Sequence, residues 1–275
     1  MIDLHTHSNA SDGTLSPTEL IEEAAKRGIS ALALTDHDTM AGIPEASRAA
    51  EGFGIRLIHG VEMEIAFEPG ECHLLGLRIS RPTAEFHEVL ADLAARRVNR
   101  NNAIMELMRE GGIEAEYADV ESFAAGKVVG RPHFASFLVH RKVVRNREQA
   151  FDRYLGKGRP FFVPKASLDM AKAFRLIKES GGVAVLAHPL SLYVSWGRLP
   201  GLIDEWKALG LDGLEAWHPT AKQRACERLE KLAVERGLLV TAGSDFHGEA
   251  RPDRRLGVTA GGKKIDDRFL AGIPS

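Results

Sequence analysis

Histidines and carboxylates in this sequence have spacings that suit metal coordination. His5 and His7 are separated by one residue in an apolar segment. Residues two apart in an extended strand project to the same face, so this pair offers two imidazoles to one ion. Asp245 and His247 have the same spacing near the other end of the chain. The two pairs make a metal site the first hypothesis for this sequence.

Further ligand-capable side chains lie in or near the ends of short apolar runs: His37, Glu62, His73 and His188. Asp12 follows His7 on the adjoining loop. Taken singly, a histidine after a strand is more often a hydrogen-bonded structural residue, and an aspartate on a loop is usually a helix cap. Their joint placement at strand ends favours a metal cluster, because purely structural roles would have to put each of these residues at a strand end independently. Nitrogen and oxygen ligands without a thiolate argue for Mn, Zn or Fe, among which we favour Mn.

The elements that must position these residues follow an α/β rhythm. Short apolar runs at 1–5, 31–34, 56–61, 183–187, 213–216 and 238–241 alternate with helical patterns, which predicts parallel βα units. The first helix is marked by Ser16 as N-cap, Pro17, a capping box with Glu19, and Gly28 at its end. Helices are also expected from about 167 to 180 and at 221–236. In α/β barrels the active site lies where the strands end, which is where the ligand-capable residues stand.

Between about 81 and 164 the rhythm changes to a long helix at 83–110 and shorter helical pieces without a buried strand. We expect one domain over residues 1–275, with a helical insertion at about 82–164 that caps the active site. Arg96, Arg97 and Arg100 on the long helix predict an exposed face.

Composition limits the remaining possibilities. The chain has 275 residues, 44% hydrophobic and 27% charged, which is ordinary globular usage. A net charge of -2 provides no global basic field for DNA or an anionic membrane, so any anion site must be local. Cys72 and Cys226 are too few for a disulfide framework, and no apolar run approaches the roughly 20 residues that cross a bilayer. We expect a cytoplasmic protein without an obligate protein partner.

Four motifs together resemble those of the polymerase-and-histidinol-phosphatase (PHP) family: His5-Thr6-His7, Thr35-Asp36-His37-Asp38, Ala187-His188-Pro189 and Ser244-Asp245-Phe246-His247. The resemblance spans nearly the whole chain in order and spacing. It implies a distorted (β/α)7 TIM-like barrel, two or three divalent ions at its carboxyl end, and phosphoester hydrolysis.

The resemblance also implies a partition of ligands among three ions. The first ion would be held by His5, His7, Glu62 and Asp245; the second by Glu62, His73 and His133; the third by Asp12, His37 and His247. In the family, a histidine often fills the position of Asp12. Without the resemblance, His133 would be an ordinary residue at a helix start. Asp36 and Asp38 are expected to orient imidazoles, with a helix cap as the alternative for Asp38.

The expected catalytic residues are His188, Arg131 and Asp245. His188 would contact phosphate or protonate the leaving oxygen, with metal ligation as the alternative. Glu215 is a candidate to orient a ligand. His218 either faces the substrate or is structural, and His59, His87 and His140 are taken as structural.

Substrate contacts are expected from Arg131, Lys157 and Arg159, because arginine matches phosphate oxygens bidentately and Lys157 lies in a glycine-flanked basic loop. The resemblance favours the subgroup that hydrolyses nucleoside 3′,5′-bisphosphates, such as adenosine 3′,5′-bisphosphate, and short 5′-phosphorylated RNA. Two alternatives stay open: a histidinol-phosphate-type or other small-molecule phosphatase, and a non-catalytic module stabilised by metal.

Overall fold

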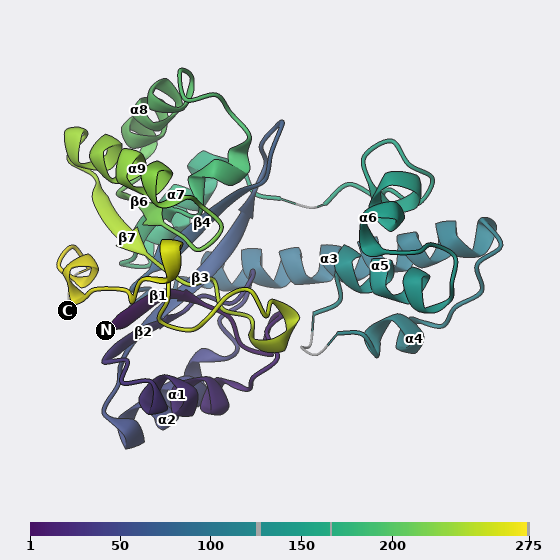
Figure 1. Cartoon of the computed structure of the whole chain (residues 1–275), viewed down its shortest axis with the longest axis horizontal. Coiled ribbons are helices and arrows are strands. Elements are labelled where there is room, and N and C mark those ends of the chain that lie inside the picture. Colours follow the sequence, from purple (N-terminus) through teal and green to yellow (C-terminus); the bar gives the residue numbers. More distant parts are fainter. Residues whose placement is uncertain (125–127, 166, 274–275) are drawn as a thin grey trace.

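Seven strands form one nearly closed barrel in the computed structural model, which describes residues 1–124, 128–165 and 167–273. The strands are neighbours in chain order, from β1 to β7. They are β1 (Ile2–Thr6), β2 (Ala31–Leu34), β3 (Arg56–Ile65), β4 (Cys72–Leu77), β5 (Val183–Leu186), β6 (Gly213–Trp217) and β7 (Leu239–Ala242). This arrangement confirms the expected distorted seven-stranded barrel (Figure 1).

Hydrogen bonds beyond the end of β7 close the barrel against β1. The backbone N–H of Asp245 donates to the carbonyl of His5 at 2.9 Å, and that of His7 donates to the carbonyl of Phe246 at 2.9 Å. Closure therefore occurs at the residues of the two ligand pairs. It brings the first motif, at His5 and His7, into direct contact with the last motif, at Asp245 and His247.

One strand departs from the parallel pattern expected from the sequence. β4 is antiparallel to both β3 and β5, because a short connection after Ile65 turns the chain back on itself. An antiparallel strand begins at the rim where its parallel neighbours end, so His73, near the start of β4, reaches the same rim. β3 also continues to Ile65, which puts Glu62 inside the strand and not at its end.

Helices that cover the outside of the barrel are α1 (Pro17–Lys26), α2 (Ile43–Phe53), α7 (Met170–Glu179), α8 (Leu199–Leu209) and α9 (Gln223–Glu235). The start of α1 confirms the predicted capping box, since Ser16 Oγ accepts from the N–H of Glu19 at 3.2 Å and the Glu19 carboxylate accepts from the N–H of Ser16 at 2.8 Å. Gly28 follows with φ of +73°, a left-handed backbone that suits glycine. α7 starts at Met170, three residues later than expected, because Leu168 is still bridged to β3.

A helical lobe projects from the barrel (Figure 1). Helix α3 (Ala84–Glu110) runs from the barrel into the lobe, which also contains α4 (Tyr117–Glu121), α5 (Arg131–His140), α6 (Arg147–Ala150) and the π turn η1 (Phe151–Leu155). The first half of α3 packs on the barrel core through Phe86 and Leu90, whereas Ile104 and Met108 enter a separate core with Phe134 and Leu138. Within the described part of 81–164 there is no strand, as predicted.

The middle of α3 contradicts the expectation of an exposed basic face. Arg96 is exposed beside Asp92, but the side chain of Arg97 is 16% exposed and pairs with buried Asp38 on the barrel. Arg100 is buried and donates from Nε to the carbonyl of Val163 at 2.9 Å. The prediction was wrong for these two because this turn of the helix lies at the junction of barrel and lobe.

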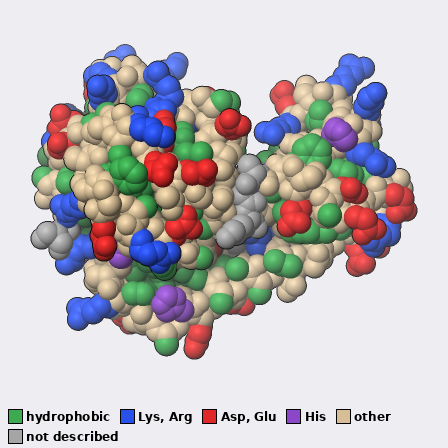
Figure 2. Space-filling view, turned by 90° about the horizontal axis from the view of Figure 1, so that it is seen from below, with side chains coloured by type: hydrophobic (Ala, Val, Ile, Leu, Met, Phe, Trp, Pro, Cys, Tyr) green, Lys and Arg blue, Asp and Glu red, His purple; other side chains and the backbone are tan. Residues whose placement is uncertain are grey.

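Charges of both signs are interspersed over barrel and lobe on the face shown in Figure 2. The remaining short turns are η2 (Pro189–Leu192), η3 (Gly248–Ala250), η4 (Ala260–Gly262) and η5 (Asp267–Leu270). Among the described residues, no helix combines the length and the apolar character that a membrane crossing requires.

Candidate metal centre

Three overlapping groups of ligand-capable side chains meet at the barrel rim. In each group, one ligand atom per residue lies within 4.8 Å of the others. The groups are His5, His7, Glu62 and Asp245; His7, Asp12, His37 and His247; and His37, Glu62 and His73. Of the nine residues predicted as metal ligands, the structure therefore brings together every one except His133.

The first group is the most deeply buried. Glu62 Oε2 lies 3.2 Å from both His5 Nε2 and His7 Nε2. Asp245 Oδ1 lies 3.2 Å from His7 Nε2 and 3.5 Å from His5 Nε2. All four residues are buried. Two carboxylate oxygens and two imidazole nitrogens thus converge on one point from three different strands or strand ends.

Three of the four ligand atoms of this group lack hydrogen-bond partners among the described residues. His5 Nε2, His7 Nε2 and Glu62 Oε2 are buried and form no hydrogen bond among the described residues. Leaving buried polar atoms unsatisfied costs about 1–3 kcal/mol each. A divalent cation would satisfy all of them at once, so the residues present fit a metal ion.

Hydrogen bonds behind the ligands select the imidazole tautomer that can bind metal. His5 Nδ1 lies 2.9 Å from Glu215 Oε1, so the ring donates there and turns the Nε2 lone pair toward the group. His247 Nδ1 donates to the carbonyl of Asp245 at 2.8 Å, which likewise leaves Nε2 facing Asp12 Oδ1 at 3.2 Å. The candidate role of Glu215 in orienting a ligand is supported by this contact.

The site is strongly charged in the absence of an ion. Burial alone would raise the pKa of Glu62, but the adjacent imidazoles of His37 and His5 hold that pKa well below its ordinary value. Burial would lower the pKa of His7, but the carboxylates of Asp245 and Glu62 outweigh it and raise the pKa to about 9. The carboxylates are therefore ionised at neutral pH, as cation ligands must be.

The second and third groups differ from the expected partition. His7 joins Asp12, His37 and His247, and His37 also completes the set of Glu62 and His73. In that set, Glu62 Oε2 lies 3.2 Å from His37 Nδ1, and Glu62 Oε1 lies 2.8 Å from His73 Nδ1. Glu62 thus faces different imidazoles with its two oxygens, the placement a bridging carboxylate needs.

His133 lies at the start of α5, outside these groups. Its Nδ1 accepts from the backbone N–H of Gly130 at 2.9 Å. A backbone N–H can only donate, so the ring proton is on Nε2, and that atom cannot bind metal in this tautomer. The structure therefore supports the alternative that His133 is a structural residue at a helix start. Metal binding by His133 stays a prediction.

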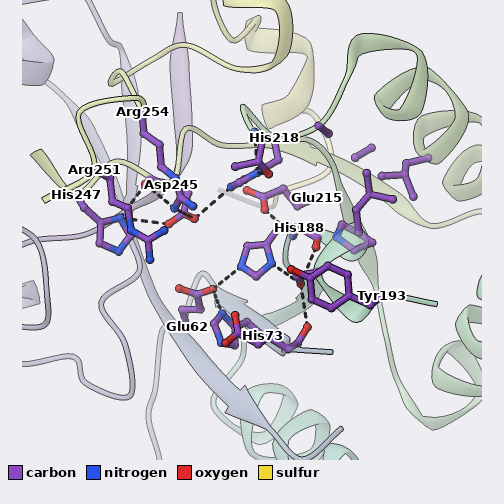
Figure 3. Close-up of a pocket in the computed structure, with 18 of the residues that line it drawn as sticks. Glu62, His73, His188, Tyr193, Glu215, His218, Asp245, His247, Arg251 and Arg254 are labelled. Atoms are coloured by element: carbon purple, nitrogen blue, oxygen red, sulfur yellow. Dashed lines mark hydrogen bonds and ion pairs between the residues drawn. The ribbon is translucent and has the colours of Figure 1, made fainter. Parts of the chain in front are cut away.

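A cavity of about 390 Å³ opens beside the metal groups (Figure 3). His188 points into it, with Nε2 3.0 Å from Glu62 Oε1 and Nδ1 2.9 Å from Ser191 Oγ. Burial lowers the pKa of His188. His218 also lines the cavity, with Nε2 3.2 Å from Asp245 Oδ2. Of the two roles considered for His218, facing the substrate or a structural one, this position supports the first. His188 and His218 are placed to contact whatever the cavity binds.

Asp36 and Asp38 do not orient imidazoles. Asp36 accepts from the N–H of Ser8 at 2.8 Å and from the hydroxyls of Ser8 and Ser11 at 2.7 and 2.6 Å. Asp38 pairs with Arg97 and accepts from the N–H of Glu64, and it caps no helix. The expectation was wrong because both carboxylates turn away from the rim, where they hold the loop after β1 and the junction with α3.

The arginines at this cavity were missed by sequence reasoning. Arg251 and Arg254 line it, and Arg254 pairs with Asp245 Oδ2. Arg131, Lys157 and Arg159, expected at the substrate, are not among the lining residues. Arg131 lies over the rings of Phe151 and Phe162 in the lobe, and Lys157 Nζ pairs with Glu68 at 2.8 Å. The three arginines at positions 251, 254 and 255, shortly after His247 in the sequence, could have indicated this cluster.

Comparisons with known proteins agree with this geometry. The sequence profile of the PHP domain matches residues 3–128. The chain is 40% identical to a 5′-3′ exoribonuclease of Haemophilus influenzae, covering 89% of each chain. It is 32% identical to a 3′,5′-nucleoside bisphosphate phosphatase of Chromobacterium violaceum, covering 94% of this chain and 91% of the relative.

A solved structure extends the similarity to three dimensions. A structure described as an amidohydrolase from Chromobacterium violaceum, with bound sulfate and no metal, matches with a TM-score of 0.85 and 29% identity. The match covers 99% of this chain and 97% of that chain. Together with the rim geometry and the relatives, it shows that the chain belongs to the PHP family.

Proposed function

We propose that this protein is a divalent-metal-dependent phosphoesterase that removes the 3′-phosphate of nucleoside 3′,5′-bisphosphates and also acts on short 5′-phosphorylated RNA. The observation that carries the proposal is the convergence of His5, His7, Glu62 and Asp245 on one point beside a cavity. Relatives named as a 5′-3′ exoribonuclease and as a 3′,5′-nucleoside bisphosphate phosphatase support the substrate class.

The proposed metal ligands are the members of the three groups, with Mn as the favoured ion because the donors are imidazole nitrogens and carboxylate oxygens. Two neighbouring divalent ions held by these residues would supply the activation of the attacking water and the neutralisation of charge that an in-line phosphoryl displacement needs. His37 is our proposed imidazole partner of Glu62 and His73. His133 would join them only if its ring released the N–H of Gly130.

The protein's own groups position the ester. His188 is held by Ser191 on one side and faces Glu62 on the other, so it can contact a phosphate oxygen or pass a proton to the leaving oxygen. Asp245 contacts His7 of the first ligand group with Oδ1 and pairs with Arg254 through Oδ2. These contacts fix the position of Arg254 in the part of the cavity where the phosphate would lie.

We assign the helical insertion at about 82–164 the role of a cap that contacts the part of a longer substrate extending from the cavity. Arg131, Lys157 and Arg159 are its proposed phosphate contacts. Lys157 already joins the lobe to the β3–β4 connection through Glu68. These contacts matter for RNA and less for a mononucleotide, which the cavity itself can hold.

Side-by-side turnover tests the substrate. The metal-loaded protein is given adenosine 3′,5′-bisphosphate, a short 5′-phosphorylated RNA and histidinol phosphate, and released phosphate and products are identified by mass spectrometry. We expect AMP and phosphate from the first, and loss of activity after chelation or in His7→Ala. Cleavage of histidinol phosphate alone would refute the substrate class. Activity that survives both chelation and His7→Ala would refute the metal mechanism.

A further inference from the structure

The cavity beside the metal groups has two unlike walls. One is the charged rim, including Glu62 and Asp245, and the other carries the apolar side chains of Pro189, Leu190 and Ala221. Its volume of about 390 Å³ lies in the range of small-molecule sites. With divalent ions held by the carboxylates of the rim, a ligand with one anionic end and one apolar end would match both walls.

Tyr193 stands at the mouth of the apolar wall (Figure 3). It is 77% exposed, and among the described residues Phe53 is the only other exposed Phe, Tyr or Trp side chain. Its backbone has a φ of 51°, the left-handed region that bulky residues rarely adopt. The turn η2 thus holds a flat ring in solvent beside the cavity. Aromatic rings so placed are platforms on which nucleobases stack.

Arg251 contributes a cation to the charged wall. The other arginine there, Arg254, already pairs with Asp245. Among the described residues, the Arg251 side chain has no ion pair, and it lies beside His247 and Asp245 in Figure 3. A guanidinium without a carboxylate partner can bind two phosphate oxygens at once.

We propose that Arg251 and Tyr193 divide substrate recognition between them, Arg251 pairing with the phosphate held at the metal groups and Tyr193 stacking on the nucleobase. The inference rests on the proposed function and adds to it the residues that select a nucleotide over other phosphoesters. It places base recognition on the barrel loop after β5, and not on the helical lobe.

Direct binding separates the two roles. Calorimetry with the Mn-loaded protein compares non-hydrolysable phosphonate analogues of adenosine 3′-monophosphate and of ribose 3-phosphate, the second of which has no base. Tyr193→Ala should weaken nucleotide binding about 5- to 150-fold, the range for loss of one base–aromatic stack, and leave the sugar phosphate unchanged. Tyr193→Phe should retain nucleotide binding. Arg251→Gln should weaken both ligands by the same factor, at least about tenfold.

Matched controls are available in the chain. Phe53→Ala removes another exposed aromatic ring, on α2, and Arg255→Gln removes an exposed arginine from the same loop as Arg251. Both should bind like the wild type.

The stacking role is refuted if wild type binds the two ligands equally, or if Tyr193→Ala weakens both or neither. The phosphate role is refuted if Arg251→Gln binds both like wild type. Failure of the proposed function looks different: the wild type would bind the nucleotide with Tyr193-dependent preference but would not hydrolyse adenosine 3′,5′-bisphosphate.

Discussion

Replacing Glu215 with glutamine tests how the metal ligands are oriented. Glu215 is fully buried on β6 and accepts two hydrogen bonds, from His5 Nδ1 at 2.9 Å and from the backbone N–H of His188 at 2.8 Å. A carboxylate can accept both. An amide has one oxygen, so Glu215→Gln must satisfy one donor and turn its NH2 group toward the other.

Either orientation of the amide is unfavourable. If its oxygen stays with the N–H of His188, the NH2 faces His5 Nδ1, which must then accept, and the ring proton moves to Nε2 and blocks ligation. Loss of such a hydrogen bond behind a ligand lowers metal affinity about 10- to 100-fold, or about 1.4–2.8 kcal/mol. If the amide flips, two buried N–H groups face each other, at a cost of about 1–3 kcal/mol in stability.

The assay combines Mn titration, followed by the electron paramagnetic resonance of free Mn, with thermal unfolding of the metal-free protein. Glu205→Gln, an exposed change on α8, is the matched control and should match wild type in both. We expect Glu215→Gln to lose affinity or stability by the amounts above. Wild-type values for both quantities would refute the argument that Glu215 selects the His5 tautomer.

Three further changes probe the centre and its support. The pKa of His7 is raised from 6.5 to about 9, so its proton stabilises the metal-free fold below about pH 6.5, and this contribution is lost as the pH rises through about 9. Mn binding should therefore release protons at pH 7 and become tighter toward pH 9, which calorimetry in buffers of different ionisation enthalpy measures. Binding at pH 7 without proton release would contradict this expectation. Gly243→Ala should abolish tight Mn binding, because an added Cβ would lie 2.2 Å from His5 Cβ. The control Gly52→Ala, on α2, meets no atom within 4 Å and should bind Mn normally. Equal Mn titrations for the two variants would show that the backbone at the rim shifts to accommodate the added methyl group. Arg97→Gln leaves buried Asp38 without its charged partner and should lower the free energy of unfolding, measured in urea, by on the order of 3 kcal/mol. Exposed Arg96→Gln should lower it by less than about 0.5 kcal/mol, and similar losses for the two variants would exclude a special role for the junction.

Local features were predictable because they depend on short-range backbone geometry. The capping box at Ser16, the long helix from Ala84 and the shared face of His5 and His7 all follow from spacings of a few residues. The resemblance of the four motifs to those of the PHP family then implied the barrel and nearly the whole ligand set.

Contacts between distant segments were decided only by the tertiary structure. The bonds from Asp245 and His7 that close β7 against β1 join segments more than 200 residues apart, and no local periodicity encodes their register. The antiparallel course of β4 brought His73 to Glu62 and His37, and the junction with α3 paired Arg97 with Asp38. Barrel closure placed Arg251 and Tyr193 on one cavity. The residue types that can bind metal were legible in the sequence, but which of them share an ion depends on strand register and closure, because these set distances across the rim.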